Sequence, residues 1–328
     1  MHLPSQTTLD TLHNGFIQLH RPDADAIRAE LSAGLLSPQA CTSPKFLYDA
    51  LGSKLFEAIC ELPEYYPTRT EAAIIEEYLP AIGRSVGRGC TLIDLGAGNC
   101  AKAARLFSTL QPVQYVPVDI SVDFLRDAVG CLQQRFPHVK MTGIGMDFSG
   151  SLELPAAVRR EKRLFFYPGS SIGNFMPQQA IEFLASMRDA CGTDGGLLIG
   201  IDLIKDKAIL DAAYDDALGV TASFNLNLLQ HLNRLIGTDF NLRDWRHRGH
   251  FNPDLGRVEM HLEARRDLTV RWDDVERRFS EGERIHTESS YKYTREAFLS
   301  MLERAGFMPA GTWTDPHSWF MVCHARAA

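Results

Sequence analysis

Short apolar runs alternate with longer stretches of helical spacing through the first two thirds of the chain. The apolar runs predict five strands buried on both faces, at 91–95, 114–120, 139–148, 163–167 and 195–204. The stretches between them repeat apolar residues every three or four positions and predict helices at 100–110, 122–136 and 177–190. Strands and helices that alternate in this way indicate a parallel sheet with helices on both faces.

The end of the chain supplies two further strands. Residues 294–305 have helical spacing and stop at Gly306, and the segments 307–314 and 319–325 then predict an antiparallel pair. This pair completes a Rossmann-like sheet of seven strands in an α/β fold.

Roughly eighty residues separate the fifth strand from the closing pair, and they form an insertion. Helical spacing at 206–218 and 221–236 predicts two helices, and a turn at 252–256 joins two strands. Val258, Met260 and Leu262 alternate along the second of these strands and share one face.

The segment before the first sheet strand is less regular. We expect residues 1–25 to be a loosely structured lead and 26–36 to be a helix. A second helix has an apolar face made of Leu55, Phe56, Ile59 and Leu62. Prolines at both ends of 63–67 predict an extended segment, and Thr68 with Glu71 fits a capping box that begins the next helix.

The turn after the first sheet strand points to a nucleotide cofactor. Gly96 and Gly98 let the backbone approach a ligand, and Asp119 lies about twenty residues on, where an acid commonly holds ribose hydroxyls. Ala101 replaces the third glycine of a dinucleotide fingerprint, which leaves NAD open. Asp94 within the strand would repel a diphosphate but favours the cationic sulfonium of S-adenosylmethionine. We therefore favour a methyltransferase-type domain over an NAD-binding one, with a glycine turn that binds no ligand as the remaining alternative.

Three more residues lie at the carboxyl ends of predicted strands, where open α/β sheets bind ligands. Asp147 and Phe148 end the third strand and suit an adenine, with a carboxylate for its amine and a ring to pack on it. Asn174 lies in a glycine- and serine-rich loop after the fourth strand and could hold an amine or a carboxylate. Asp147 and Phe148 are equally compatible with an ordinary strand end.

Two other features are candidates for a substrate site. Tyr65 and Tyr66 lie on the proline-bounded segment, and they fit either turn packing or a lid that presents phenol hydroxyls. Glu288 and Ser290 project from the same face of a strand, roughly 6 to 7 Å apart, and could hold a small polar heterocycle. An exposed strand with ordinary polar residues is the alternative for this second pair.

Composition narrows the class of protein. The net charge of −7 over 328 residues argues against a nucleic-acid-binding surface, and the arginine-rich segment 243–250 is short enough to be a solvated strand face. Seven dispersed cysteines predict reduced thiols and no metal site. No secretion signal or membrane-spanning run is evident, so we expect a soluble, cytoplasmic protein.

Several motifs together resemble the histidine Nα-methyltransferases of the ergothioneine pathway, which make the trimethylated betaine hercynine. The resemblance extends from about residue 25 to the end of the chain. The motifs are YDALGSKLF (48–56), LPEYYPTRTE (62–71), LGAG (95–98), GSSIGN (169–174), YDDALGVTASFN (214–225) and TESS (287–290). The chain differs at Asn99 and Cys100, where some members carry Thr-Ser, and in a longer N-terminus.

The resemblance implies a class I methyltransferase core with an inserted substrate-binding domain, and it implies a role for each matching residue. The residues implied to bind S-adenosylmethionine are Tyr48, Gly96, Lys102, Asp119, Asp147 and Phe148. Those implied to bind the amino acid are Tyr65, Gly169, Asn174, Tyr214, Met260, Glu288 and Ser290. Within these sets, Asn174 and Tyr214 would anchor the α-amino and carboxylate end, and Tyr48, Tyr65 and Asn174 are the candidate catalytic residues.

The Glu288 and Ser290 pair favours histidine among amino acids. A buried carboxylate and hydroxyl are satisfied by an imidazole, whereas an aliphatic or phenyl side chain would leave both unpaired. Tryptophan could satisfy the carboxylate through its single N–H, so tryptophan or a prenylated tryptophan remains the alternative substrate.

The resemblance also divides the chain and defines its partners. We expect residues 1–70 to contribute to the substrate domain or a lid, 71–204 and 286–328 to form the cofactor-binding core, and 205–285 to be the inserted α+β region. The expected partner is a small amino acid, with no nucleic acid and no membrane, and the expected oligomeric state is a monomer.

Overall fold

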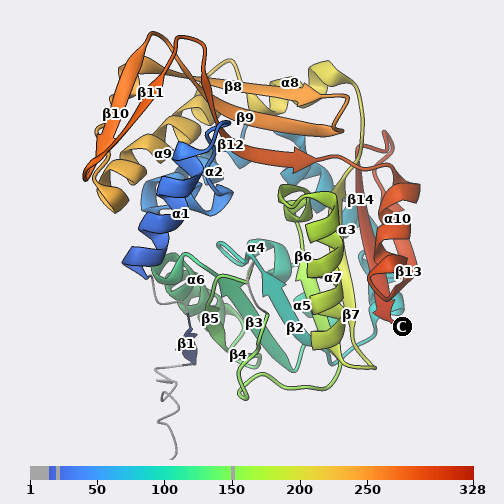
Figure 1. The fold of residues 1–328 in the computed structure, drawn as a ribbon. Helices are drawn as coiled ribbons and strands as arrows, with labels where there is room; N and C mark the ends of the chain where they lie inside the picture. Colours follow the sequence, from blue (N-terminus) through green and yellow to red (C-terminus); the bar gives the residue numbers. More distant parts are fainter. Residues whose placement is uncertain (1–14, 20–22, 149–151) are drawn as a thin grey trace, which may run out of the picture.

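A mostly parallel nine-stranded sheet forms the lower half of the molecule (Figure 1). The computed structural model describes residues 15–19, 23–148 and 152–328. The strand order is β1-β5-β3-β2-β6-β7-β14-β13, with β4 also paired to β3, and only the pairings of β14 with β7 and with β13 are antiparallel. The strands are β1 (Phe16–Gln18), β2 (Thr91–Leu95), β3 (Gln114–Asp119), β4 (Lys140–Met141), β5 (Gly143–Gly145), β6 (Arg163–Tyr167), β7 (Gly196–Asp202), β13 (Phe307–Thr314) and β14 (Phe320–Ala327).

The class I methyltransferase arrangement predicted from the sequence is confirmed, with two additions to its seven strands. The predicted third strand is divided into β4 and β5, because Pro117 of the neighbouring β3 has no N–H to continue the hydrogen-bond ladder there. The second addition is β1, which pairs with β5 at the edge of the sheet. The expectation of a loosely structured lead is therefore wrong at Phe16–Gln18, and residues 1–14 and 20–22 lie outside the described residues.

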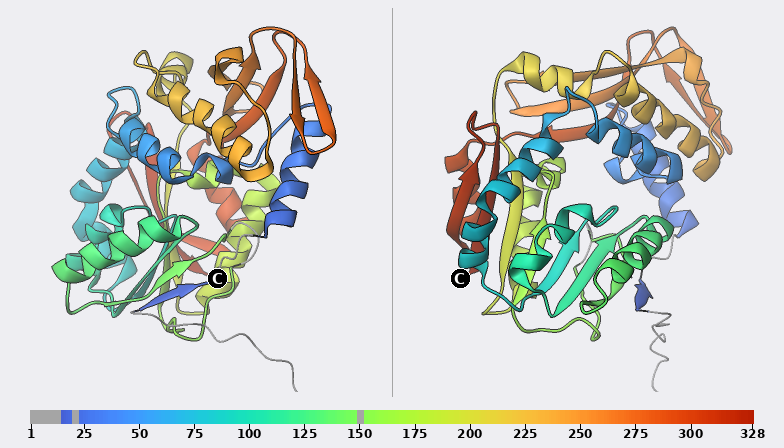
Figure 2. Two further views of the ribbon diagram at one scale, coloured as in Figure 1. Left: turned by 90° about the vertical axis from the view of Figure 1, so that its left-hand side faces the viewer. Right: turned by 180° about the vertical axis from the view of Figure 1, so that it is seen from behind.

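Helices cover both faces of this sheet (Figures 1 and 2). One face packs against four helices, α3 (Tyr66–Val86), α4 (Ala101–Ala104), α5 (Phe107–Leu110) and α6 (Val122–Arg135). The other packs against α7 (Pro177–Cys191) and α10 (Arg295–Arg304). In the described part of the chain, each helix is too short or too polar to cross a lipid bilayer.

The upper half of the molecule is built around a three-stranded antiparallel sheet in the order β12-β9-β8 (Figure 1). Its apolar core combines helices of the N-terminal segment with helices and strands of the insertion, so these two parts of the chain fold together. The elements are α1 (Ala24–Leu36), η1 (Pro44–Leu47), α2 (Ala50–Cys60), α8 (Lys207–Tyr214), α9 (Val220–Ile236), η3 (Leu242–Asp244), β8 (Trp245–Asn252), β9 (Arg257–Ala264), β10 (Leu268–Trp272), β11 (Val275–Phe279) and β12 (Arg284–Tyr291). Because β12 pairs with β9, the inserted sheet continues past the boundary expected at residue 285.

Local predictions differ from the structure in three places. The capping box at Thr68 and the extended conformation predicted for Tyr66 and Pro67 are wrong, because α3 already begins at Tyr66 with Pro67 in its first turn. The helix predicted at 100–110 is divided into α4 and α5. The helix predicted to end at 218 ends at Tyr214. The Asp216 carboxylate instead accepts the N–H groups of Val220 and Thr221, the first two residues of α9, whose N-cap is Gly219.

Candidate active site

The turns that follow β2 and β3 are held together by one carboxylate. Gly96 and Gly98 have φ values of +69° and +51°, which favour glycine at both positions. Asp119 Oδ2 accepts the Gly98 N–H at 2.9 Å, and its Oδ1 accepts the Ser121 N–H at 2.9 Å. Asp119 thus fixes both turns at the carboxyl edge of the sheet, where the sequence predicts the cofactor.

Asp94 is a buried acid in the middle of the same edge. Its Oδ2 accepts a hydrogen bond from the Tyr115 hydroxyl at 2.7 Å, whereas its buried Oδ1 has no partner among the described residues. Burial raises the pKa of Asp94 to about 7, and the Tyr115 hydrogen bond opposes this shift. A buried carboxylate oxygen without a partner suits a cationic ligand such as S-adenosylmethionine and does not suit a diphosphate.

Phe148 provides an apolar wall beside the glycine turn. A Cβ added at Gly96 would lie 3.9 Å from the end of the Phe148 ring, so this ring borders the space above the turn. The ring of Phe148 also contacts Tyr167 and Phe183, which hold it in place. The neighbouring Asp147 forms an ion pair with Lys45 of η1, at 3.7 Å between Nζ and Oδ2. These features fit the predicted adenine site.

Glu71 is a site residue that the sequence reasoning missed. Its Oε2 accepts a hydrogen bond from Lys102 Nζ at 2.8 Å, and its Oε1 accepts the Gly169 N–H at 2.8 Å. A Cβ at Gly200 would lie only 1.9 Å from Glu71 Oε1, so any larger residue there would displace this carboxylate. Glu71 therefore connects a predicted cofactor residue, Lys102, with a predicted substrate residue, Gly169.

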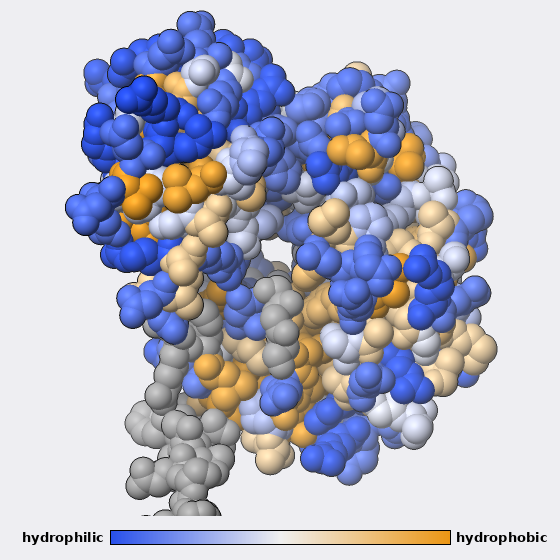
Figure 3. Space-filling model, in the orientation of Figure 1, coloured by the Kyte–Doolittle hydropathy of each residue, from blue (hydrophilic) through white to orange (hydrophobic). Residues whose placement is uncertain are grey.

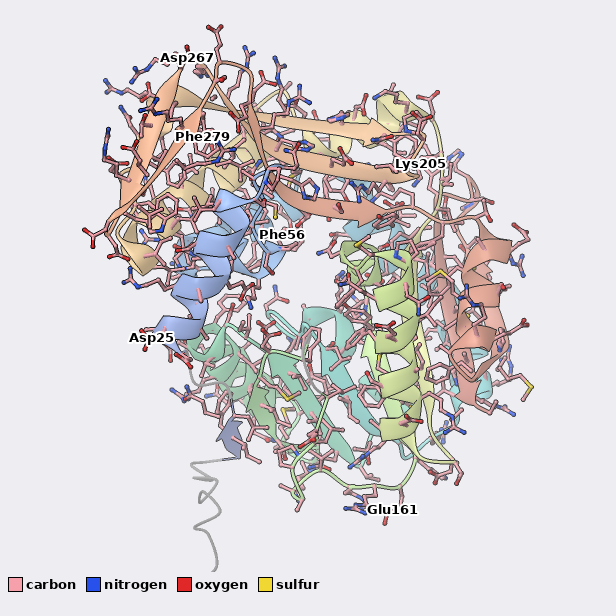
Figure 4. All side chains as sticks on the ribbon, in the orientation of Figure 1. Asp25, Phe56, Glu161, Lys205, Asp267 and Phe279 are labelled. Carbon is pink, nitrogen blue, oxygen red and sulfur yellow. The ribbon has the colours of Figure 1, made fainter. Side chains whose placement is uncertain are left out.

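Aromatic rings gather on the side of the upper half that faces the large sheet. Tyr48 packs against Phe56 and Phe224, with ring centroids 5.6 and 5.5 Å apart. Tyr65 lies 6.1 Å from the rings of both Phe56 and Tyr214. Figure 4 labels Phe56 on this side of the upper half, and Figure 3 shows a hollow between the two halves. Three of the predicted site tyrosines thus line one aromatic wall.

Burial shifts the pKa of each of these tyrosines upward. For Tyr48 and Tyr65, loss of solvation is the main cause, and the neighbouring Glu288 carboxylate adds to it. For Tyr214, burial also raises the pKa, and the charge of Lys292 opposes the shift. The three hydroxyls are therefore neutral at physiological pH and act as hydrogen-bond groups rather than as anions.

Glu288 and Ser290 are buried on β12, 7% and 5% exposed, so the alternative of an exposed polar strand is wrong. Glu288 lies directly opposite Met260 of β9, so their side chains share one face. Burial raises the pKa of Glu288 to about 7, against the opposing charge of Lys292. Its carboxylate accepts no hydrogen bond from any residue that the structure describes.

Ser290 belongs to a buried polar network that the sequence reasoning also missed. Ser290 Oγ accepts hydrogen bonds from Tyr214 at 3.0 Å and from Lys292 Nζ at 2.8 Å. Lys292 in turn forms a buried ion pair with Asp202 at the end of β7, at 2.8 Å. The same Asp202 carboxylate accepts hydrogen bonds from Tyr66 and Lys205, and Figure 4 labels Lys205 near this junction. The two-residue spacing of Ser290 and Lys292 was the sequence signal for this network.

Asn174 ends the 3-10 helix η2 (Ser171–Asn174), which packs against β12. A Cβ at Gly173 would lie 2.7 Å from the Tyr291 carbonyl oxygen and 3.5 Å from Ser290 Oγ. Glycine at 173 thus brings the loop that carries Asn174 against the strand that carries Ser290. The half-buried Asn174 side chain forms no hydrogen bond with the described residues.

Comparisons with known proteins agree with this geometry. Residues 27–327 match a family described as histidine-specific, S-adenosylmethionine-dependent methyltransferases. The chain is 38% identical over 300 residues to a histidine N-alpha-methyltransferase of Mycolicibacterium smegmatis, covering 89% of this chain and 92% of that protein. It is 36% identical to a histidine N-alpha-methyltransferase of Mycobacterium tuberculosis, covering 88% and 91%.

A fungal protein shares part of its length with this chain. Ergothioneine biosynthesis protein 1 of Neurospora crassa is 31% identical over 281 residues, which cover 82% of this chain and 31% of that protein. The family match spans nearly all of the chain, including both halves of the molecule. The chain therefore belongs to the family of S-adenosylmethionine-dependent, histidine-specific methyltransferases.

Proposed function

We propose that this protein methylates the α-nitrogen of L-histidine three times and forms hercynine, the first step of ergothioneine biosynthesis. The observation that carries the proposal is the buried pair Glu288 and Ser290, which lies beside the aromatic wall of Tyr48, Tyr65 and Tyr214. Relatives named histidine N-alpha-methyltransferase align over about nine tenths of the chain and support the same substrate.

Recognition of the imidazole rests on the cost of leaving buried polar groups unpaired. Glu288 lacks a hydrogen-bond donor among the described residues, and an N–H of the imidazole ring would supply one. An aliphatic or phenyl side chain would leave this carboxylate unsatisfied, at a cost of roughly 1–3 kcal/mol or more. Met260, opposite Glu288, would provide the apolar surface for the ring.

The residues present fit S-adenosylmethionine, as the unpaired oxygen of Asp94 and the open glycine turn indicate. When bound, this cofactor supplies the methyl group of its sulfonium. The remainder of the cofactor is then a neutral thioether and a good leaving group. The residues proposed to hold it are Tyr48, Gly96, Lys102, Asp119, Asp147 and Phe148. Glu71 would keep Lys102 in position, since the two side chains form a hydrogen bond.

The residues of the substrate half would hold the amine and exclude water. We propose that Asn174 and Tyr214 bind the α-amino and carboxylate groups. Tyr48 and Tyr65 would border the nitrogen as it becomes quaternary, because aromatic faces attract a cation without a charge of their own. Their hydroxyls, kept neutral by burial, would carry the ammonium proton toward solvent before each transfer.

Mass spectrometry with methyl-labelled cofactor tests this proposal. Purified protein and L-histidine should yield mono-, di- and trimethylated products with label on the α-nitrogen. Tryptophan and a prenylated tryptophan, offered in parallel, should remain unmodified. Folded protein that binds S-adenosylhomocysteine but leaves histidine unmethylated would refute the proposal.

We also propose which part of the chain binds each ligand and in which compartment the enzyme acts. Residues 1–70 and the insertion would bind the amino acid and the core would bind the cofactor, a division that the shared apolar core of α1, α2 and α9 supports. Seven free cysteines support a reducing compartment such as the cytoplasm. The monomeric state remains a prediction, which light scattering tests.

A further inference from the structure

Lys292 lies where the two halves of the molecule meet, one residue beyond the end of β12. Its side chain is fully buried. The ammonium group donates three hydrogen bonds of 2.8 Å each, to Asp202 Oδ2, to the Tyr214 hydroxyl and to Ser290 Oγ. An ammonium has three N–H groups, so all of its donors are used within the protein. Lys292 therefore has no donor left for a ligand.

These bonds determine what Ser290 can offer to a ligand. A serine hydroxyl has two acceptor lone pairs and one hydrogen. Ser290 Oγ accepts one bond from Lys292 and another from the Tyr214 hydroxyl. Both acceptor positions are therefore occupied. The hydroxyl hydrogen is the only polar group of Ser290 that remains for a ligand.

We propose that Lys292 is a positioning residue that makes Ser290 an obligate hydrogen-bond donor, so that the site binds the neutral form of an imidazole. This inference rests on the proposed function. Ser290 donates to the unprotonated ring nitrogen, and the Glu288 carboxylate accepts from the ring N–H. A single arrangement of protons satisfies both side chains.

Two other rings fail this arrangement for different reasons. An imidazolium carries an N–H on both nitrogens, so one of them would face the hydrogen of Ser290. An indole offers an N–H to Glu288 but has no ring nitrogen that accepts from Ser290. The Lys292 network thus gives a physical reason for selecting histidine over tryptophan, in addition to the presence of a carboxylate.

The groups around the ring leave few other sources of pH dependence. Tyr48, Tyr65 and Tyr214 face Glu288, and burial raises the pKa of all three. Burial disfavours the charge of Lys292, but the Asp202 carboxylate outweighs this and raises the pKa of Lys292. Between about pH 5.5 and pH 8, Glu288 and the imidazole of the ligand are therefore the groups that titrate at the ring. Burial also brings the pKa of Asp94 to about 7 and that of Lys205 to about 8, but neither residue has a hydrogen bond with Glu288 or Ser290, so we expect their titration to affect both ligands compared below alike.

Calorimetry on the protein saturated with S-adenosylhomocysteine separates these two groups. Histidine is compared with 2-fluorohistidine, whose ring stays unprotonated over this range while its shape is nearly unchanged. Lowering the pH from 8 to 5.5 should weaken histidine binding about tenfold more than binding of the fluorinated analogue, because the free imidazole has a pKa of roughly 6.5. Equal weakening of both ligands would overturn the inference.

A matched pair of variants tests the part played by Lys292. In Lys292→Met, Ser290 regains an acceptor position, so the difference between the two ligands at pH 5.5 should fall from about tenfold to about twofold or less. Lys205→Met is the control, since Lys205 bonds to the same Asp202 but makes no contact with Ser290 or Tyr214. This control should keep the tenfold difference. A difference that persists unchanged in Lys292→Met would overturn the inference.

A second variant covers the case in which Lys292→Met does not fold. Ser290→Ala removes the donor itself and should abolish the same pH difference, with cofactor binding as the check on folding. Persistence of the difference in Ser290→Ala contradicts the inference. Wild-type protein that binds S-adenosylhomocysteine but no histidine at any pH would instead refute the proposed function, so the two failures are distinct.

Discussion

The proposed cofactor side and the proposed substrate side of the site each contain one buried carboxyl group whose pKa is raised to about 7 by burial. On the cofactor side, the edge of the nine-stranded sheet, this is Asp94, and Tyr115 donates a hydrogen bond to it. On the substrate side, the face of the three-stranded sheet, it is Glu288, which has no such donor in the described chain. Tyr115 satisfies one oxygen of Asp94, whereas Glu288 has no donor among the described residues, and we propose that the ligand supplies it.

The two sides are also assembled differently. The cofactor side uses backbone groups of turns that directly follow neighbouring parallel strands, such as the Gly98 N–H that bonds to Asp119. The substrate side uses side chains from distant segments, such as Tyr66 and Asp202, which lie 136 residues apart. The substrate side therefore exists only after the whole chain has folded, and it should be the more sensitive of the two to changes at the junction.

The largest expected effect follows from removing the charge of Asp202, which lies where the two halves of the molecule meet. Asp202→Asn leaves Lys292 and Lys205 without their shared carboxylate. Loss of one partner of a buried ion pair costs about 3–5 kcal/mol, so the free energy of unfolding in urea should fall by that amount. Histidine binding should fall more than cofactor binding, because Lys292 also holds Tyr214 and Ser290.

The matched control is Asp189→Asn, which breaks an exposed ion pair with Arg188. A surface pair contributes about 0–1 kcal/mol, so this variant should be nearly as stable as the wild type. If Asp202→Asn were no less stable than Asp189→Asn, the buried network would not be a source of stability.

The next largest effect is on ligand affinity, and we expect one variant on each side to weaken the binding of a different ligand. Glu288→Ala should weaken histidine binding by ~10²-fold or more and leave S-adenosylhomocysteine binding nearly unchanged, since it removes the only acceptor proposed for the ring N–H. Asp119→Asn should do the reverse and weaken cofactor binding by ~10-fold to ~10²-fold, because a hydrogen bond to a charged group contributes about 1.5–3 kcal/mol. Calorimetry of both ligands on both variants checks this, and parallel losses would show that the sides are not separable.

The contrast between the sides also explains what the sequence could predict. Strand β2, its glycine turn and α4 lie within about a dozen consecutive residues, so their pattern is visible in the sequence and most of the sheet was predicted correctly. Glu71, Asp202 and Lys292 were missed, because their roles depend on partners far away in the chain. Even the helix start was misplaced, since Tyr66 is fixed by its hydrogen bond to Asp202 and not by a local cap.

A third effect concerns stability as a function of pH on the cofactor side. The pKa of Asp94 is about 7 in the folded protein and about 3.8 in the unfolded chain. Between these values the folded protein retains a proton that the unfolded chain has lost, so the free energy of unfolding decreases as the pH rises from about 4 to 7. The decrease is up to about 1.4 kcal/mol per pH unit for one such group.

Asp94→Asn should remove this contribution and give a flatter stability profile than the wild type in urea unfolding between pH 5 and pH 7.5. Glu288→Gln should flatten the profile in the same direction from the substrate side, because its pKa is raised by burial as well. An Asp94→Asn profile with the same slope as the wild type would mean that Asp94 is ionised throughout this range.

The smallest effect belongs to a link between the two sides. Lys45 of η1, in the substrate half, bonds to Glu30 at 2.8 Å and lies 3.7 Å from Asp147 on the cofactor side. Its side chain is partly exposed, so Lys45→Ala should cost less than about 1 kcal/mol of stability and weaken cofactor binding only a few-fold. Any loss should shrink as salt is raised, because ions screen such a pair. Lys207→Ala, which breaks an exposed pair with Asp211 away from the cofactor, is the control and should leave cofactor affinity unchanged. A loss in Lys45→Ala as large as that in Asp119→Asn would show that the substrate half itself holds the cofactor, and the two sides would then have to be regarded as one site.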